Sequence, residues 1–171
     1  MNLEIKQLSE CPEHLETVGS WIYEEWWRTP DNNPDIVMKP LRTHMGKSSF
    51  PFTVVAIVDG KPIGSCCVIE NDCSHRPQYA PWVAAVFVKP EKRLQGVASG
   101  VLKEVVQISK KLRIKGLYID CFAKTASLYE KNGWKILEMD VGQKDSIVMY
   151  QSTCSEQIAS GNSQGRGELE E

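Results

Sequence analysis

A short basic turn between an apolar segment and a helical pattern carries the clearest chemistry in the chain. The turn, residues 93–99, reads Arg-Leu-Gln-Gly-Val-Ala-Ser and follows the apolar residues 82–88. A helix that begins here exposes backbone N–H groups without intrahelical partners and the positive end of the peptide dipole. Small residues such as Gly96 let a phosphate approach the backbone, and Lys92 and Arg93 add positive charge. The turn therefore predicts a pyrophosphate site, although the pattern alone fits an ordinary solvated turn equally well.

A second segment, residues 126–134, reads Ala-Ser-Leu-Tyr-Glu-Lys-Asn-Gly-Trp. It has the form A-x-x-L-Y-E-K-x-G-F/W, and the basic turn has the form R/Q-x-x-G-x-G/A with Ala98 at its last position. At this separation the two patterns resemble the motifs of the GNAT superfamily of acyl-CoA-dependent N-acyltransferases. The resemblance extends from about Leu3 to Tyr150, because the order of the predicted elements is also that of the family.

The resemblance implies a mixed α/β (α+β) fold of the GNAT type. Its central, mostly antiparallel seven-stranded sheet would splay between the fourth and fifth strands and be flanked by about four helices. Residues 1–150 would form the N-acetyltransferase domain. Residues 151–171 are rich in Ser, Gln, Gly and Glu and too poor in apolar groups to bury a core, so we expect a disordered polar tail.

The resemblance also implies that acetyl-CoA binds in the split as the cosubstrate, and that no metal is needed. The pantetheine arm would pair with the predicted fourth strand, where a bulge would aim an amide N–H at the thioester carbonyl. Such an oxyanion donor contributes about 2.7–4 kcal/mol in other enzymes. The residues that we expect to bind the cofactor are Val86, Phe87, Val88, Arg93, Leu94, Gln95, Gly96, Val97, Ala98 and Ser99.

Tyr129 matches the tyrosine of the second motif, and the resemblance implies that it acts as a general acid or as the donor that anchors the CoA sulfur. Without the resemblance, Tyr129 reads as a core aromatic. No motif identifies the base that deprotonates the incoming ammonium, and residues 81–85 hold no carboxylate where some family members place a glutamate. The candidates, acting directly or through water, are Glu24, Glu25, Glu70, Asp72 and His75, and the sequence favours none of them.

The acceptor is predicted to be a primary amine of a small molecule or peptide that attacks the thioester directly. An aromatic cluster could line a pocket for the amine and bind its ammonium group through cation–π contacts. However, Trp26 fits the core face of its helix, so packing explains at least half of the cluster. The cluster is Trp21, Tyr23, Trp26 and Trp27, and the acidic residues beside it that would suit a cationic substrate are Glu24, Glu25, Asp31 and Asp35.

The elements that must position these residues follow from periodicity and turn residues. Two apolar runs, 52–58 and 63–69, flank Asp59-Gly60 and predict an antiparallel hairpin. The almost wholly apolar residues 82–88 predict a central strand, and residues 97–112 predict an amphipathic helix that Gly116 closes. The other predicted elements are strands at 3–8, 117–122, 134–137 and 147–150 and helices at 12–26, 37–46 and 125–132, the last capped by Gly133.

Composition narrows the class of protein. The 171 residues are 42% hydrophobic and 25% charged with a net charge of −2, which is typical of one globular domain and argues against nucleic-acid binding. No apolar run reaches the roughly 18 residues of a membrane span, and the N-terminus lacks a signal pattern, so we predict a cytoplasmic protein without a membrane partner. The six cysteines lack the spacing of zinc ligands and read as buried, reduced thiols. The oligomeric state stays open, with a homodimer among the options.

Three rival functions are weighed against an N-acetyltransferase. A non-catalytic acyl-CoA-binding sensor or interaction module would keep the cofactor site and is the main alternative. An acyl-cysteine route through Cys121 is disfavoured, because nothing near this residue in sequence lowers a thiol pKa. A Rossmann-like nucleotide-binding domain is disfavoured as well, since its phosphate turn normally follows the first strand and this one follows the fourth.

Overall fold

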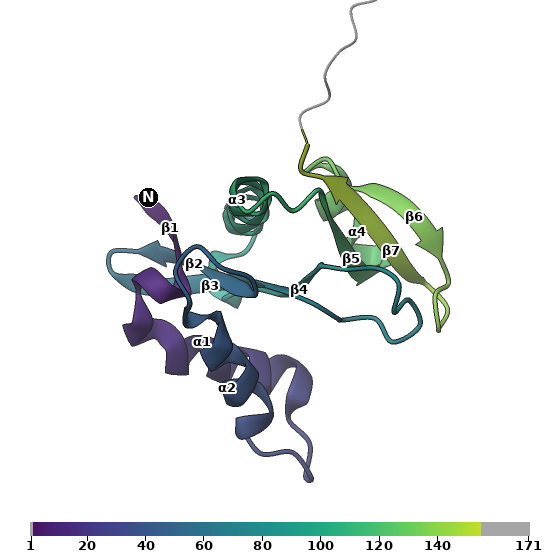
Figure 1. The fold of residues 1–171 in the computed structure, drawn as a ribbon. Helices are drawn as coiled ribbons and strands as arrows, with labels where there is room; N and C mark the ends of the chain where they lie inside the picture. The colour runs from purple at the N-terminus through teal and green to yellow at the C-terminus, as the bar shows by residue number, and fades with distance from the viewer. Residues whose placement is uncertain (1, 155–171) are drawn as a thin grey trace, which may run out of the picture.

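A seven-stranded sheet forms the centre of the protein in a computed structural model that describes residues 2–154 (Figure 1). The strands are β1 (Leu3–Gln7), β2 (Phe52–Val58), β3 (Lys61–Ile69), β4 (Trp82–Val88), β5 (Gly116–Phe122), β6 (Lys135–Met139) and β7 (Ser146–Ser152). They lie in the order β1-β2-β3-β4-β5-β7-β6. Only β4 and β5 pair in parallel, and the other neighbours are antiparallel. The predicted mixed α/β fold with a mostly antiparallel seven-stranded sheet is confirmed.

Helices cover both faces of the first half of the sheet. Two of them, α1 and α2, lie on one face of β2–β4, α3 lies on the opposite face, and α4 packs beside β5 and β7 (Figure 1). The helices are α1 (Leu15–Ile22), α2 (Asp35–Arg42), α3 (Val97–Lys111) and α4 (Ala123–Glu130), with short helical segments η1 (Leu8–Glu10), η2 (Pro12–His14), η3 (Tyr23–Trp27), η4 (Thr43–Met45) and η5 (Pro90–Lys92). No helix within residues 2–154 has the length and apolar content that a bilayer crossing requires.

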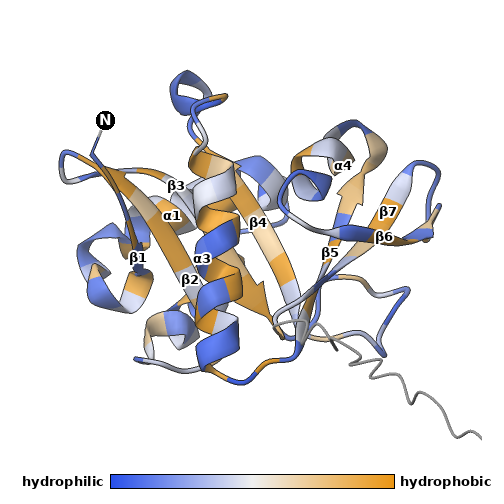
Figure 2. Ribbon diagram, turned by 90° about the horizontal axis from the view of Figure 1, so that it is seen from above, coloured by the Kyte–Doolittle hydropathy of each residue, from blue (hydrophilic) through white to orange (hydrophobic). Residues whose placement is uncertain are grey.

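The core has two layers because the sheet is buried on both sides. Val54 and Ala56 of β2 pack with the apolar stripe of α3, whereas Val55 and Ile57 face the opposite way and pack with α1 and α2. Alternate residues of a strand point to opposite faces, so a strand covered on both faces has to be apolar throughout. Figure 2 shows the hydrophilic outer surface of α3 above these hydrophobic strands.

The sheet is split where β4 meets β5. Their register contains a single pair, Trp82 with Tyr118, and the Tyr118 N–H donates to the Pro81 carbonyl at 3.0 Å. Tyr79 stacks on Tyr118 with ring centroids 4.6 Å apart, and Trp82 lies 5.6 Å from the same ring. The aromatic rings therefore hold the vertex, and the strands diverge beyond it. This confirms the predicted splay between the fourth and fifth strands.

Several predicted boundaries are wrong. The helix predicted from Pro12 to Trp26 consists of η2, α1 and a π-helical turn, η3. Gly116 does not close α3, which ends at Lys111 and is followed by Arg113 with φ of 60°. Gly116 begins β5 instead, and glycine is required there because a Cβ would overlap the ring of Tyr150.

The C-terminal end of the sheet reaches beyond the predicted domain boundary at residue 150. Strand β7 includes Gln151 and Ser152, and Thr153 is buried. The Thr153 N–H donates to the Lys115 carbonyl at 3.1 Å. Most of the predicted polar tail, residues 155–171, lies outside the described residues.

Candidate active site

A bulge interrupts β4 beside the split. The register between β3 and β4 shifts so that Ala85 and Val86 lie opposite the single residue Cys66. Ala85 has φ of 49°, in the left-handed region. Bulges of this kind turn backbone groups away from the ladder, and β4 beyond Trp82 has no register partner on β5. This edge therefore offers free backbone donors and acceptors to an extended ligand.

The chain beyond β4 leads to the start of α3 through a left-handed turn. Leu94 has φ of 59°, and Gly96, the residue that caps α3, has φ of 81°. A Cβ at Gly96 would meet nothing within 4 Å, so backbone conformation rather than crowding favours glycine there. The first helical bond runs from the Gly100 N–H to the Gly96 carbonyl at 2.9 Å. The N–H groups of Val97, Ala98 and Ser99 lie ahead of it, as a bound anion requires.

Two side chains of the same turn bind backbone carbonyls. The Arg93 Nε–H donates to the Val88 carbonyl at 3.1 Å, and the Gln95 amide donates to the Glu91 carbonyl at 3.1 Å. Arg93 therefore ties the turn to the end of β4. Both side chains therefore have a structural role in addition to any contact with a phosphate.

The two sequence motifs meet in space. The Asn132 side-chain amide, which follows α4, donates to Ser99 Oγ at 3.0 Å and to the Leu128 carbonyl at 2.8 Å. It thus joins the end of α4 to the first turn of α3 across the split. Since the motifs lie on opposite halves of the sheet, this bridge fixes the distance between the predicted anion site and α4.

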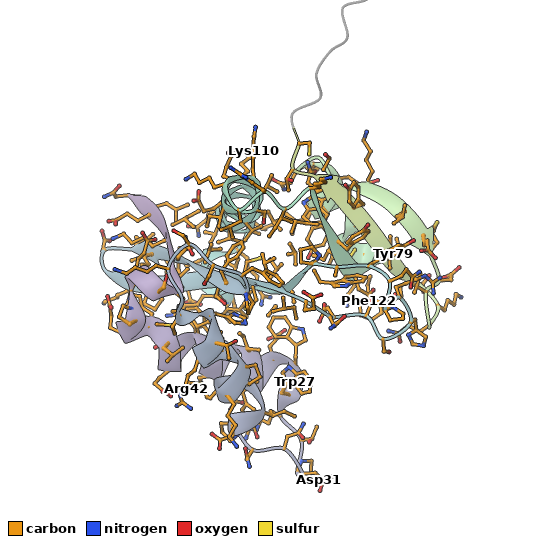
Figure 3. The ribbon with its side chains drawn as sticks, in the orientation of Figure 1. Trp27, Asp31, Arg42, Tyr79, Lys110 and Phe122 are labelled. Atoms are coloured by element: carbon orange, nitrogen blue, oxygen red, sulfur yellow. The ribbon has the colours of Figure 1, made fainter. Side chains whose placement is uncertain are left out.

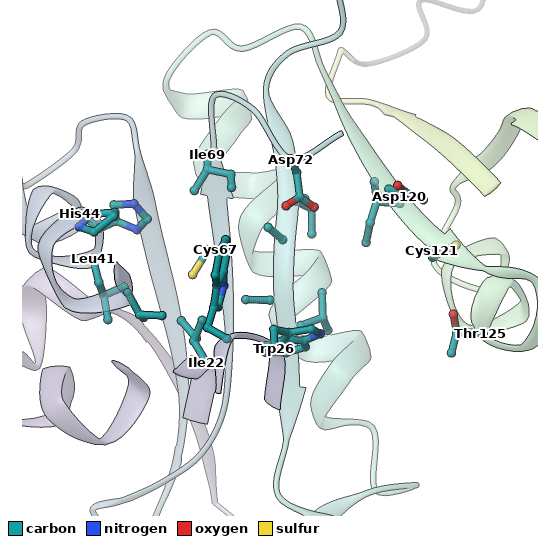
Figure 4. A pocket seen from close by; sticks show the side chains of 18 of the residues that line it. Ile22, Trp26, Leu41, His44, Cys67, Ile69, Asp72, Asp120, Cys121 and Thr125 are labelled. Atoms are coloured by element: carbon teal, nitrogen blue, oxygen red, sulfur yellow. The ribbon is translucent and has the colours of Figure 1, made fainter. Parts of the chain in front are cut away.

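A cavity of about 690 Å³ lies under the middle of the sheet, between α1 and α2 on one side and α4 on the other (Figure 4). Of the predicted site residues, Val86 and Tyr129 line it. Phe87, Val88 and residues 93–99 do not line it and lie along β4 and its following turn. The predicted residues therefore form one continuous path from the helix start to the cavity.

Tyr129 enters the cavity wall from α4. It is 7% exposed, and its ring meets Trp134 edge-on with centroids 6.3 Å apart. Burial, with smaller contributions from Cys121 and Cys66, raises the pKa of the Tyr129 phenol far above its usual value. The hydroxyl thus stays protonated and able to donate a hydrogen bond.

Of the five candidate bases, only Asp72 lines the cavity; Glu24, Glu25, Glu70 and His75 do not. Asp72 is exposed at the mouth of the cavity, yet the protein around its carboxyl hinders hydration. This partial burial, and secondarily the charge of Asp120, raises the pKa of Asp72 to about 6. A carboxyl with that pKa is mostly ionised at pH 7 and can accept a proton.

Asp120 is a cavity residue that we did not predict from the sequence. It lies on β5, where it accepts a hydrogen bond from Ser146 Oγ at 2.8 Å, and faces the split from the side opposite Asp72 (Figure 4). The available signal was a charged residue inside the otherwise apolar run 117–122. Such residues are seldom buried without a function or a partner.

The aromatic cluster divides into two pairs. Trp21 stacks on Phe87 with centroids 5.0 Å apart, and the Tyr23 hydroxyl donates to the Asn32 carbonyl at 2.7 Å. Trp26 and Trp27 are 48% and 45% exposed and line the cavity; Figure 3 shows Trp27 below the sheet. The prediction that Trp26 packs in the core is wrong, because η3 widens the helix and changes the direction of its side chains.

The acidic residues beside that cluster lie elsewhere. None of Glu24, Glu25, Asp31 and Asp35 lines the cavity. Glu24 pairs with Arg28 at 2.6 Å and Asp35 with Lys39 at 3.7 Å, both on the surface. The predicted attraction of a cationic substrate by these four residues thus has no support in their placement.

The cysteines are unpaired and mostly buried. Cys11, Cys66, Cys67, Cys73 and Cys121 are buried, as predicted, and Cys154 is exposed, which is a correction. Burial raises the pKa of the Cys121 thiol to about 11, so the thiolate that an acyl-cysteine route needs is scarce at neutral pH. Within residues 2–154, no group of three or more His, Cys, Asp or Glu is placed to hold a metal ion.

Comparisons with known proteins agree on one family and one fold. A family model described as an acetyltransferase (GNAT) domain matches residues 50–136. No sequence match was found among curated proteins. Many solved structures share the fold.

Three of these structures are similar over nearly the whole described chain, at identities low enough that the likeness concerns the fold. An aminoglycoside 6'-N-acetyltransferase complexed with coenzyme A has a TM-score of 0.67 at 14% identity, covering 89% of this chain and 98% of that one. YncA from Salmonella typhimurium with its cofactor acetyl-CoA has a TM-score of 0.67 at 14% identity, covering 91% of this chain and 96% of that one. A GNAT acetyltransferase from Streptococcus pneumoniae has a TM-score of 0.66 at 14% identity, covering 88% of this chain and 99% of that one.

Proposed function

Since the chain belongs to the GNAT acetyltransferase family, we propose that it is an N-acetyltransferase that transfers the acetyl group of acetyl-CoA to a primary amine by direct attack. The observation that carries this proposal is the bulged, unpaired edge of β4 that leads into the open start of α3. An extended thiol arm can pair with this edge, and a pyrophosphate suits the helix start. Relatives of the same fold hold coenzyme A or acetyl-CoA.

The cofactor site, in this proposal, comprises the residues that the motifs indicate. Backbone groups of Val86, Phe87 and Val88 bind the pantetheine arm, and the turn from Arg93 to Ser99 binds the pyrophosphate. At the bulge, an N–H beside Ala85 donates to the carbonyl oxygen that becomes negative during attack. Because the backbone supplies this donor, its position depends on the register of β3 and β4 rather than on a rotamer.

Asp72 serves as the base. An alkylammonium has no lone pair, so it must lose a proton before its nitrogen can attack. Asp72 takes that proton directly or through water, a C–N bond forms and the C–S bond breaks. Of the two protons that the ammonium loses overall, one leaves to solvent and one ends on the sulfur of the released CoA.

Tyr129 supports the departure of the sulfur as a hydrogen-bond donor. An ordinary thiol has a pKa of about 8.5, far below that of the buried Tyr129 phenol. Complete proton transfer from Tyr129 to the thiolate would thus be uphill. A hydrogen bond to a charged acceptor still contributes about 1.5–3 kcal/mol, so we assign Tyr129 to stabilising the negative charge that develops on the sulfur as the C–S bond breaks.

Acetyl-CoA titration calorimetry and a thiol-release assay across a panel of primary amines test the function. We expect heat of binding, release of free CoA with at least one amine, and an N-acetylated product by mass spectrometry. Absence of both heat and thermal shift would refute the cofactor site. Binding without turnover for every amine would favour the acyl-CoA-binding sensor instead. The six unpaired cysteines support a cytoplasmic setting, where thiols stay reduced.

A further inference from the structure

We propose that the acceptor is a small monoamine whose single ammonium group is carried on an apolar, aromatic body. The inference rests on the proposed acetyltransferase function and concerns the part of the cavity that lies beyond the bulge of β4. Two features of this space carry it: an uncompensated negative end and a long apolar wall. Neither feature is needed to bind acetyl-CoA.

The negative end consists of Asp72 and Asp120. They are the carboxylates that line the cavity, and they face each other across the split (Figure 4). No Lys or Arg lines the cavity within residues 2–154, and none forms an ion pair with either carboxylate in that part of the chain. His44, the one histidine in the wall, is buried, and that burial lowers its pKa to about 4, so it is neutral at pH 7. The space therefore attracts a cation and repels an anion.

The apolar wall is formed by residues that leave large hydrophobic surfaces open to water. Trp26 and Trp27 of η3, Ile36 of α2 and Phe122 at the end of β5 are between 39% and 48% exposed, and all four line the cavity. They account for four of the nine large hydrophobic side chains exposed within residues 2–154. Exposed apolar side chains gathered around one cavity indicate a ligand that covers them.

The polar groups of the wall are few. Besides the two carboxylates and Tyr129, the polar side chains are those of His44, Thr125 and Gln143, and weaker or single donors come from the thiols of Cys67 and Cys121 and the indoles of Trp26 and Trp27. His44 already binds Thr53 Oγ1 through Nδ1 at 2.7 Å. A polyhydroxylated acceptor would lose water from many hydroxyls and gain fewer partners than it has hydroxyls, which costs free energy for each unpaired one.

Charge spacing argues against polyamines. An acceptor with several ammonium groups would place one between Asp72 and Asp120, and the next would lie against the wall of Trp26, Trp27 and Leu41. That wall offers at most a cation–π contact in place of a counter-charge. The volume of about 690 Å³ also has to admit the acetyl end of the donor, which leaves room for a small molecule.

A panel of acceptors at saturating acetyl-CoA tests the substrate class. We expect kcat/KM for 2-phenylethylamine and tryptamine to exceed that for ethanolamine, spermidine, kanamycin and a short peptide by at least tenfold. If spermidine, kanamycin or the peptide equals or exceeds the aromatic amines, the substrate class is wrong while the acetyltransferase stands. If no amine is acetylated, the proposed function fails and the substrate class with it.

Paired variants test the wall. Trp26→Ala should raise KM for 2-phenylethylamine at least fivefold, change KM for ethanolamine less than twofold and leave acetyl-CoA affinity unaltered. Leu137→Ala is the matched control, because Leu137 is 46% exposed on β6 and lies outside the cavity. Equal effects of Trp26→Ala on both amines, or an equal effect of Leu137→Ala, would overturn the assignment of the wall. The inhibition constant of uncharged 2-phenylethanol should be at least tenfold higher than the dissociation constant of 2-phenylethylamine. Equal values would overturn the role of the carboxylates.

Discussion

Replacing Asp120 by Asn removes the negative charge that faces Asp72 across the split, and it should move the acid limb of the pH profile to lower pH. The pKa of Asp72 is raised to about 6, first by burial and then by Asp120. With a pKa of about 6, about nine-tenths of the Asp72 carboxyl is ionised at pH 7 and about one-tenth at pH 5. If Asp72 is the base, kcat/KM of the unaltered protein loses about tenfold between these pH values through Asp72 alone.

The variant keeps the burial but loses the neighbouring charge, so the pKa of Asp72 falls part of the way toward its ordinary value of about 3.9. Its loss of kcat/KM between pH 7 and 5 should therefore be smaller than in the unaltered protein. The acceptor amine is itself protonated over this range, and its contribution cancels in the ratio of the two profiles. Asp120→Asn will also raise KM if Asp120 holds the ammonium. That effect lowers kcat/KM at every pH and does not change the pH at which the ratio of the two kcat/KM profiles changes.

The assay is CoA release at saturating acetyl-CoA and subsaturating amine, from pH 5 to 8. Asp59→Asn, in the tight turn between β2 and β3, is the matched control that removes one carboxylate far from the cavity. Asp72→Asn should abolish the acid limb near pH 6 together with most of the activity. If the acid limbs of Asp120→Asn and the unaltered protein superimpose, Asp120 does not influence the pKa of Asp72. If Asp72→Asn keeps an acid limb near pH 6, Asp72 is not the base.

Four further predictions concern the remaining parts of the site. Tyr129→Phe should lower kcat about 10- to 100-fold, as loss of a hydrogen bond to a charged sulfur implies, without changing acetyl-CoA affinity in calorimetry; an unchanged kcat would exclude its role. Gly96→Ala places a side chain at φ of 81°, which costs roughly 1–2 kcal/mol in chemical denaturation and should weaken acetyl-CoA binding; equal stability and affinity would contradict this. Glu138→Gln removes the charge that binds Arg76 and should increase proteolysis of the loop before β4. His44 has a folded pKa of about 4 against about 6.5 unfolded, so the stability it contributes is complete above pH 6.5 and falls by roughly 3 kcal/mol between pH 7 and 4; in His44→Gln, denaturation midpoints should depend less on pH over that range.

Local sequence signals predicted much of the fold because they depend on neighbouring residues. Asp59 and Gly60 adopt φ of 50° and 72°, as their tight turn requires, and β2 and β3 pair around them. Gly116 was misassigned because its neighbour in space, Tyr150, lies 34 residues further along the chain. Trp26 was misassigned because a single π-helical turn breaks the periodicity from which a core position was inferred.

The parts of the candidate site that a single backbone segment forms could be predicted from the sequence. The parts that the topology brings together from distant segments could not. The turn around Gly96 carries its own left-handed geometry, so its motif indicates an anion site without the rest of the fold. Asp72 was one of five equivalent candidates, and nothing in its own segment sets it apart. What distinguishes it is its position in the cavity wall, where burial and then the charge of Asp120, 48 residues later in the chain, raise its pKa. No local pattern encodes that position.

One set of contacts links the proposed cofactor edge to the proposed base. The loop that carries Asp72 is held to β6 by Arg76, whose Nε–H donates to Glu138 at 2.8 Å, and by the Tyr79 hydroxyl, which donates to the same carboxylate at 2.7 Å. Tyr79 then stacks on Tyr118 at the only register pair between β4 and β5. The contacts that hold the single pair between the two strands therefore also hold the loop of Asp72 beside β5. A substitution that loosens this vertex should therefore impair acetyl-CoA binding and proton abstraction together, because the same contacts hold both parts in place.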